Sequence, residues 1–235
     1  MTEQDVFSRK ADQWWDLEGP FKMLHKMNAC RMNAIQKFLG DLQGKTVFDY
    51  GCGGGILAET LSSMGAKVTG MDMSRESIEV ARAYGHKQST GVNYLHGTID
   101  DLDDRYFSDA QFDVVCALEC LEHVTYPERL VASLSGCIKE GGYAVFSTIN
   151  RSLYTYLMGI VAAEYLLGWV EPGTHEHAKF IKPSELVKMS TNAGLELEEL
   201  EGMSFSMRDQ DFSLSNDVSL NYIAIFKKQK KTIGK

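Results

Sequence analysis

Apolar stretches of strand length alternate with helical patterns along most of this chain. Apolar runs of strand length predict strands at 45–50, 67–72, 92–95, 112–118 and 142–148. Apolar residues at helical spacing predict helices at 27–40, 55–64, 75–90, 127–138 and 183–193. This alternation is typical of a parallel sheet that helices cover on both faces.

The last quarter of the chain has a different pattern. Glu196 to Ser206 and Ser219 to Phe226 read as two longer strands. Together they predict an antiparallel hairpin at one edge of the sheet. We therefore expect an α/β fold with a doubly wound, mostly parallel seven-stranded sheet and a C-terminal antiparallel hairpin.

A glycine-rich turn follows the first predicted strand, in the run Thr-Val-Phe-Asp-Tyr-Gly-Cys-Gly-Gly-Gly-Ile at 46–56. Glycines there accept a positive φ and allow a bulky ligand to approach, and the helix that follows points its free N–H groups at that ligand. A dinucleotide fingerprint reads G-x-G-x-x-G, but Ile56 occupies its last position. The spacing Gly51-x-Gly53-x-Gly55 instead favours S-adenosylmethionine and a Rossmann-like, class I methyltransferase fold.

Acidic residues follow the next two predicted strands. Asp72 ends the second strand, where a carboxylate accepts hydrogen bonds from both ribose hydroxyls. The same acid serves NAD equally well, and an ordinary turn aspartate is the alternative. Asp100 and Asp101 follow the third strand and are weaker candidates for a carboxylate near the adenine amino group, because acidic loops are usually solvated.

Three side chains that can bind a metal follow the fourth predicted strand, after Leu118: Glu119, Glu122 and His123. Ligands bind at the carboxyl ends of strands in α/β sheets. Two carboxylates and one imidazole suit a hard divalent ion, Mg²⁺ first, with Mn²⁺ and Zn²⁺ as alternatives. In the other interpretation, the acids only stabilise a helix N-terminus through its dipole.

The same segment bears on the methyl acceptor. It lacks the Asn/Asp-Pro-Pro-aromatic run expected of a transferase that methylates amino groups of nucleic acid. A phenol oxygen suits the site better, since its pKa of about 10 must fall before it attacks well at neutral pH, and a metal or a histidine lowers it.

The composition and net charge indicate a single domain and limit the classes of molecule that the protein can bind. The 235 residues are 44% hydrophobic, which suits one compact domain, 1–235. A net charge of −8 argues against nucleic acid as a partner, because phosphate binding needs a basic face. Five cysteines without a C-x-x-C pair indicate free thiols in a reducing compartment.

Two segments lie outside the expected cofactor core. The N-terminal segment, 1–40, carries Trp14, Trp15 and Arg31, and we expect it to cover the cofactor or substrate. Arg31 is a candidate for the carboxylate of the methionine moiety, with a charged surface helix as the alternative. The insert at 151–182 is apolar from 153 to 170, where Glu164 is the single charged residue. We interpret it as a lid or as a helix at the membrane–water interface, with dimer contact or plain burial as the alternative.

Several motifs together resemble the ubiquinone biosynthesis O-methyltransferases. They are Phe-Asp-Tyr-Gly-Cys-Gly-Gly-Gly-Ile-Leu-Ala-Glu (48–59), Trp-Trp-Asp-Leu-Glu-Gly (14–19), Leu-Glu-Cys-Leu-Glu-His-Val (118–124), Ser-Thr-Ile-Asn-Arg (147–151) and Gly-Thr-His-Glu-His-Ala-Lys-Phe-Ile-Lys-Pro (173–183). The glycine turn specifies only the superfamily, whereas the double tryptophan and the Gly-Thr-His run are far more specific.

The resemblance implies methylation, by S-adenosylmethionine, of catechol-type hydroxyls on polyprenylated ubiquinone precursors, at two steps of the pathway. It assigns Arg31, Gly51, Asp72 and Leu118 to the cofactor, beside Gly53 from the turn, and Glu119, Glu122 and His123 to Mg²⁺. In one departure, the family often reads Asn-Pro-x-Arg where this chain has Asn28-Ala29-Cys30-Arg31.

The expected partners are a polyprenyl catechol or quinol, the lipid surface and other ubiquinone biosynthesis proteins. We expect a peripheral position on the bacterial inner membrane, with the mitochondrial matrix face as the alternative. If no metal is bound, His123 or His175 is the candidate general base. Two other functions stay open: methylation of a soluble phenolic acceptor, and a cofactor-binding scaffold in a biosynthetic complex.

Overall fold

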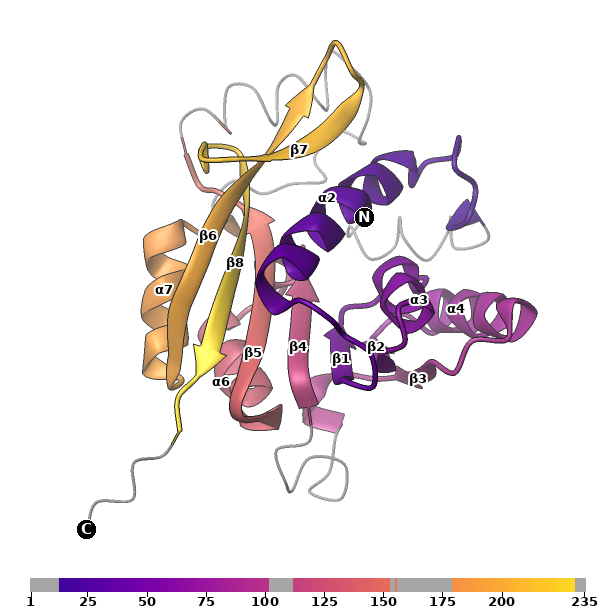
Figure 1. Ribbon diagram of the computed structural model, residues 1–235, viewed down its shortest axis with the longest axis horizontal. Helices are drawn as coiled ribbons and strands as arrows, with labels where there is room; N and C mark the ends of the chain where they lie inside the picture. Colours follow the sequence, from indigo (N-terminus) through magenta and orange to yellow (C-terminus); the bar gives the residue numbers. More distant parts are fainter. Residues whose placement is uncertain (1–12, 102–111, 153–154, 156–178, 231–235) are drawn as a thin grey trace.

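The described strands form one eight-stranded sheet in the order β3-β2-β1-β4-β5-β8-β6-β7 (Figure 1). The computed structural model describes residues 13–101, 112–152, 155 and 179–230. The strands are β1 (Thr46–Tyr50), β2 (Lys67–Asp72), β3 (Asn93–His96), β4 (Phe112–Leu118), β5 (Ile138–Ile149), β6 (Leu195–Ser206), β7 (Asp211–Ser215) and β8 (Asn221–Lys228). Strands β1 to β5 are parallel, and β8, β6 and β7 add antiparallel pairs.

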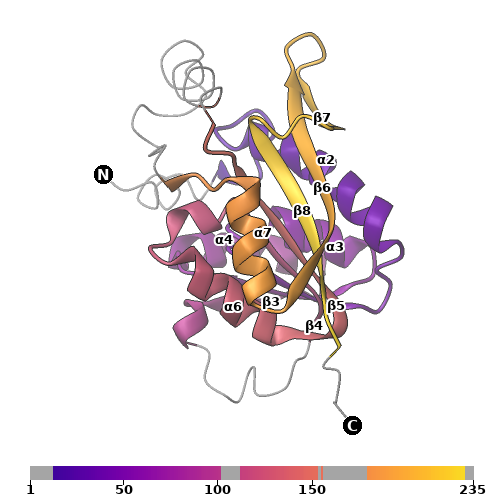
Figure 2. The ribbon, with the colours of Figure 1, turned by 90° about the vertical axis from the view of Figure 1, so that its left-hand side faces the viewer.

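The helices cover both faces of this sheet. They are α2 (Lys22–Leu39), α3 (Ile56–Ser63), α4 (Arg75–Gln88), α6 (Pro127–Cys137) and α7 (Pro183–Asn192), with short 3₁₀ turns η2 (Ile99–Asp101) and η3 (Leu121–His123). Apolar residues of α2, α3 and α4 pack into one core cluster, and those of α6 and α7 into a second. Figure 2 shows β8 and β6 between α7 on one side and α2 on the other.

Strand β4 shows why the sheet is buried on both faces. Val114 and Cys116 join the cluster beneath α2, α3 and α4, whereas Val115 and Ala117 join the cluster beneath α6 and α7. Successive side chains of a strand point to opposite faces, so a continuous apolar run is what a doubly covered strand requires.

The predicted fold class is confirmed, with one strand more than expected. The predicted strands at 196–206 and 219–226 correspond to β6 and β8, which pair antiparallel. The additional strand is β7, which pairs with the end of β6. Helix α2 begins at Lys22 rather than at residue 27, and β5 begins at Ile138 rather than at 142.

Candidate active site at the carboxyl edge of the sheet

The candidate site residues gather where neighbouring parallel strands end. β1 lies between β2 and β4. Gly51 directly follows β1, Asp72 is the last residue of β2, and Leu118 is the last of β4. The strand order therefore brings the three predicted cofactor positions to one edge, which is where open α/β sheets bind ligands.

Three residues of the glycine turn have a left-handed backbone. Gly51, Gly53 and Gly55 have φ angles of 74°, 52° and 90°. Only glycine adopts such angles without strain. The backbone N–H of Gly51 also donates to the carbonyl of Met71 (2.8 Å), so the turn is tied to β2.

The space beside these glycines is filled by other side chains. A Cβ on Gly53 would lie 2.6 Å from the Trp14 indole, and one on Gly55 would lie 2.3 Å from the Tyr94 hydroxyl oxygen. A Cβ on Gly51 would meet the Cys120 Sγ at 3.0 Å. The turn therefore needs glycine for its packing against the protein as well as for any ligand.

Asp72, at the end of β2, holds the glycine turn through hydrogen bonds. One carboxylate oxygen accepts from the Gly53 N–H (2.9 Å) and the other accepts from the Ser74 N–H (2.8 Å). Burial raises the pKa of Asp72 above its usual value, although these backbone donors oppose the shift. Each carboxylate oxygen has more than one lone pair, so Asp72 keeps acceptor capacity for ribose hydroxyls.

Asp101, an adenine candidate, is used within its own turn. One of its oxygens accepts from both the backbone N–H and the hydroxyl of Thr98, at 2.6 and 2.8 Å. These two bonds lower the pKa of the exposed Asp101 carboxyl. The structure thus gives Asp101 a local structural role.

Arg31 and Glu119 form a buried ion pair at this edge. The Arg31 Nη2 lies 3.1 Å from the Glu119 Oε1, and Arg31 is only 6% exposed. This contact is an ion pair and not a hydrogen bond: neither Nε nor Nη2 of Arg31 has a hydrogen-bond partner among the residues that the structure describes. The guanidinium is therefore short of acceptors, and its donors match a carboxylate in geometry and charge.

Glu119 is fixed by two further donors and has an unusual backbone. Its Oε1 accepts from the Ser147 hydroxyl (2.8 Å), and its Oε2 accepts from the Asn221 Nδ2 (3.3 Å). Its φ is 51°, which is rare for a residue with a side chain. Such strain is common at functional sites.

Glu122 and His123 differ sharply in environment. Glu122 is buried and accepts from the Thr148 hydroxyl (2.8 Å), whereas His123 is exposed. Burial, followed by the nearby Glu119 charge, raises the pKa of Glu122 to about 8. Two carboxyl groups thus lie near each other, one paired with an arginine and the other within the protein interior.

The predicted metal site is not assembled in this arrangement. Among the described residues, which include Glu119, Glu122 and His123, no group of three or more His, Cys, Asp or Glu side chains is placed to hold a metal ion. Glu119 already pairs with a cation, and Glu122 is bonded to Thr148. The residues as placed do not fit Mg²⁺.

Two tryptophans of the N-terminal segment, in the part that the structure describes, pack against the glycine turn. The Trp14 indole packs on Gly53 and Gly54, and the Trp15 Nε1 donates to the Gly54 carbonyl (3.1 Å). Trp15 also stacks on Tyr84 of α4. The segment from Trp14 to Arg31 therefore touches both the turn and the Arg31–Glu119 pair.

Two further buried carboxyl groups, Asp49 and Glu59, lie near the turn and were not predicted as site residues. Burial raises the pKa of Asp49 in β1 to about 7, against the lowering effect of the Arg31 charge. Glu59 of α3 accepts from the Tyr94 hydroxyl (2.7 Å). Their position, one before the glycine turn and one in the helix after it, was the signal available in the sequence.

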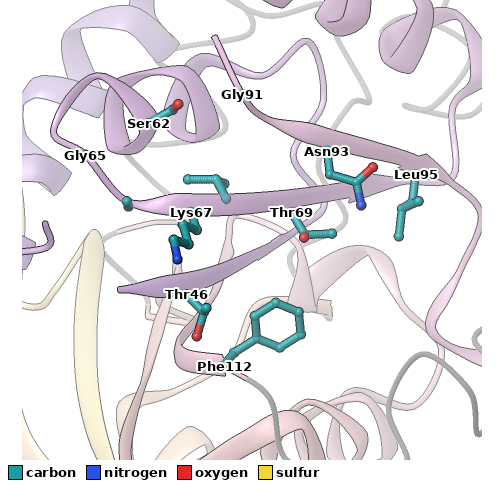
Figure 3. Close-up of a pocket in the computed structure, with 11 residues that line it drawn as sticks. Thr46, Ser62, Gly65, Lys67, Thr69, Gly91, Asn93, Leu95 and Phe112 are labelled. Atoms are coloured by element: carbon teal, nitrogen blue, oxygen red, sulfur yellow. The ribbon is translucent and has the colours of Figure 1, made fainter. Parts of the chain in front are cut away.

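A cavity of about 600 Å³ lies at the opposite edge of the sheet (Figure 3). Thr46, Lys67, Asn93 and Phe112, which line it, are the first residues of β1 to β4. It is therefore remote from the glycine turn, and the site is assigned from the polar side chains at the carboxyl edge.

The predicted insert falls largely outside the described residues, as do His175 and residues 1–12 of the N-terminal segment. In the part that is described, no helix is both long and apolar enough to cross a membrane.

Proteins of similar sequence identify the family of this chain. A family model described as a methyltransferase domain matches residues 23–200. The ubiquinone biosynthesis O-methyltransferase of Idiomarina loihiensis is 44% identical over 94% of this chain and 90% of its own length. The enzyme of the same name from Rickettsia bellii is 39% identical over 96% and 95% of the two chains.

Solved structures share the fold at low sequence identity. Magnesium protoporphyrin IX methyltransferase from Synechocystis, with bound S-adenosylhomocysteine, gives a TM-score of 0.69 at 19% identity, covering 96% of this chain and 98% of that one. An S-adenosylmethionine-dependent methyltransferase from Mesorhizobium loti gives 0.62 at 18% identity, covering 85% and 98%.

Proposed function

This chain belongs to the family of ubiquinone biosynthesis O-methyltransferases, and from that premise we propose that it methylates catechol-type hydroxyls of polyprenylated ubiquinone precursors. The family and the fold make it an S-adenosylmethionine-dependent O-methyltransferase. We assign to it both O-methylation steps of the pathway. We also propose a peripheral position on the membrane and contact with other ubiquinone biosynthesis proteins.

One observation carries the assignment of the cofactor. Asp72, the glycine turn and the acceptor-poor guanidinium of Arg31 lie at one edge of the sheet. A ribose needs an acidic acceptor, and an amino acid moiety needs a cation for its carboxylate. We propose that Asp72 binds the ribose, Arg31 the carboxylate, and Gly51, Gly53 and Leu118 the surface between them.

Alignment is the main contribution of the protein to the reaction. S-adenosylmethionine supplies a methyl group on a positively charged sulfur, which a catechol oxygen attacks in line. The side chains must present that oxygen and remove its proton, and correct orientation alone can remove a large part of the barrier. Exclusion of water is the role we propose for the insert at 151–182.

Glu119, Glu122 and His123 form the proposed catalytic set. Glu119 and Glu122 are fixed by Ser147, Asn221 and Thr148, which suits two carboxyl groups that form hydrogen bonds with the two catechol hydroxyls. His123 is exposed, so the catechol substrate can reach it. Imidazole is a frequent general base at neutral pH. We propose His123 as the base, with His175 as the other candidate.

Binding of Mg²⁺ by Glu119, Glu122 and His123 stays a prediction. A metal ion that used Glu119 would have to share this carboxylate with the Arg31 guanidinium, 3.1 Å away. Two cations repel each other at such a site. Chelation of the wild-type protein is the test.

A peripheral position on the membrane is supported by exposed apolar residues at the same edge. Met73 follows β2, Tyr126 follows the 3₁₀ turn after β4, and Met207 follows β6, which runs parallel to β5. All three side chains are more than half exposed. Such side chains at the entrance suit the lipid boundary from which a polyprenyl chain must come. Met207→Asp is expected to lower the fraction of protein that sediments with anionic vesicles and to leave cofactor binding unchanged.

The pathway assignment is tested in a bacterial strain that lacks its own ubiquinone O-methyltransferase. Expression of this chain is expected to restore ubiquinone, measured by chromatography, whereas expression of Asp72→Ala at the same level is not. If the wild-type chain accumulates in folded form and the precursor remains unmethylated, the pathway assignment is wrong.

A further inference from the structure

The guanidinium of Arg31 belongs to the proposed cofactor site and also contacts Glu119 of the proposed acceptor site. Its Nη2 lies 3.1 Å from the Glu119 Oε1, while its Nε has no hydrogen-bond partner in the described part of the chain. Asp49, a second buried carboxyl group, also interacts with this charge. An arginine that binds the carboxylate of the cofactor would therefore do so in contact with a carboxylate of the acceptor site.

Glu119 does not depend on Arg31 alone for its position. The Ser147 hydroxyl donates to Oε1 (2.8 Å) and the Asn221 Nδ2 donates to Oε2 (3.3 Å). The backbone N–H of Glu119 donates to the Ser147 carbonyl (2.9 Å), so its left-handed backbone is tied to β5. These contacts keep the carboxylate in place when the guanidinium finds another partner.

We propose that Arg31 couples the two substrates of the enzyme: the cofactor carboxylate competes with Glu119 for the guanidinium, and cofactor binding frees Glu119 Oε1 to accept the catechol hydroxyl. The proposal rests on the proposed function, in which Arg31 binds the cofactor carboxylate. It makes the Arg31–Glu119 ion pair an inhibitory contact that the cofactor relieves. It also predicts that the cofactor promotes binding of the acceptor.

The direction of the coupling follows from charge. Two carboxylates that share one buried guanidinium repel each other, so each is stabilised less by the positive charge than it would be alone. Coupling between two binding sites is reciprocal and commonly changes affinity by about 5- to 150-fold. Neutralising Glu119 is therefore expected to increase the affinity for the cofactor. This direction is unusual, because the substitution removes an acidic residue from a site that binds a cationic ligand.

The experiment is calorimetric titration of S-adenosylhomocysteine, which keeps the carboxylate and the ammonium group and lacks the sulfonium charge. Glu119→Gln is expected to bind it about fivefold tighter than wild type, or more. Glu122→Gln is the matched control: it changes the neighbouring buried carboxyl group, which forms no ion pair with Arg31, and its affinity for S-adenosylhomocysteine is expected to stay within about twofold. The decarboxylated form of S-adenosylhomocysteine is expected to show no tightening with Glu119→Gln.

Arg31→Ala separates this inference from the proposed function. Unchanged affinity of Arg31→Ala for S-adenosylhomocysteine would show that Arg31 does not bind the cofactor carboxylate at all. A loss of affinity in Arg31→Ala without any gain in Glu119→Gln would overturn the competition and leave the proposed function in place.

A measurement on the wild-type protein covers the case in which Glu119→Gln does not fold. A short-chain prenyl catechol is titrated with and without saturating S-adenosylhomocysteine. The inference predicts at least about fivefold tighter binding of the catechol in its presence. Equal or weaker binding would overturn the inference without any substitution.

Discussion

The indole of Trp14 occupies the space that a side chain on Gly54 would need. A Cβ on Gly54 would lie 2.4 Å from the Trp14 Cγ, closer than such atoms approach in proteins. The adjacent Trp15 donates to the carbonyl of the same glycine. The N-terminal segment and the cofactor turn are therefore fitted to each other, and a change in either one is expected to move the other.

Gly54→Ala tests this fit. Overpacking of this kind typically costs about 1–3 kcal/mol, so we expect the free energy of unfolding in urea to fall by that amount and the tryptophan fluorescence to change. Gly91→Ala is the control, because nothing lies within 4 Å of its added Cβ. In a Trp14→Ala background the cost of Gly54→Ala is expected to shrink. Purely additive effects would mean that the two residues do not constrain each other.

Asp72→Asn is expected to weaken binding of S-adenosylhomocysteine by about tenfold or more, because hydrogen bonds to a charged group contribute about 1.5–3 kcal/mol each. Asp113→Asn is the control from the opposite edge of the sheet. Its carboxylate accepts from Thr46 and pairs with Lys139, so its loss is expected to lower stability and leave cofactor affinity unchanged. Calorimetric titration of both variants decides whether Asp72 contacts the cofactor.

Asp49 predicts a specific pH dependence of stability. Burial raises its pKa to about 7 in the folded protein, whereas an unfolded aspartate has a pKa of about 3.9. Between these values the unfolded chain loses the proton and the folded protein keeps it. Its contribution is therefore fully present below about pH 4 and is lost as the pH rises through about 7, by up to about 1.4 kcal/mol per pH unit.

Asp49→Asn is expected to remove this slope. Urea unfolding of the variant and of the wild type between pH 4.5 and about 7.5 isolates it, because every other titrating group is shared by the two proteins. The stability of the wild type should fall relative to the variant as the pH rises. Parallel curves would show that Asp49 titrates normally.

The strands that bury both faces could be predicted from the sequence alone. β2 and β4 have the predicted bounds, and β4 has from Val114 to Leu118 the continuous apolar run that a doubly covered strand requires. β7 could not be predicted in this way: its residues, Asp-Phe-Ser-Leu-Ser, are exposed or half-buried, and β6 is its one partner among the described strands. The start of α2 lacks an acidic first turn and a side-chain cap, which are the usual signals.

The site could be predicted in position but not in its contacts. Motif residues at strand ends share an edge once the strands are parallel, which is why Gly51, Asp72 and Leu118 come together. The pairing of Arg31 with Glu119 and the packing of Trp14 on Gly54 join distant parts of the chain. Hydrophobic periodicity encodes which face of an element is buried, and it carries no information about the partner of a polar group.

Glu122→Ala, together with chelation of the wild-type protein, tests the proposed catalytic set of Glu119, Glu122 and His123. We expect the variant to lose turnover while its affinity for S-adenosylhomocysteine stays close to that of wild type, because Glu122 is assigned to the acceptor. Glu128→Ala, an exposed acid in the first turn of α6, is the control and should keep both. In the wild type, turnover that EDTA abolishes and Mg²⁺ restores would support the metal prediction, whereas turnover that survives chelation would remove the metal from the mechanism.

The most direct test of the central claim is transfer of a labelled methyl group from S-adenosylmethionine to a short-chain prenyl catechol, with the product identified by mass spectrometry. We expect O-methylated product from the wild-type protein, much less from Asp72→Asn at subsaturating cofactor, and none from Glu122→Ala. Cofactor binding without methyl transfer to any such catechol, by a folded wild-type protein, would contradict it.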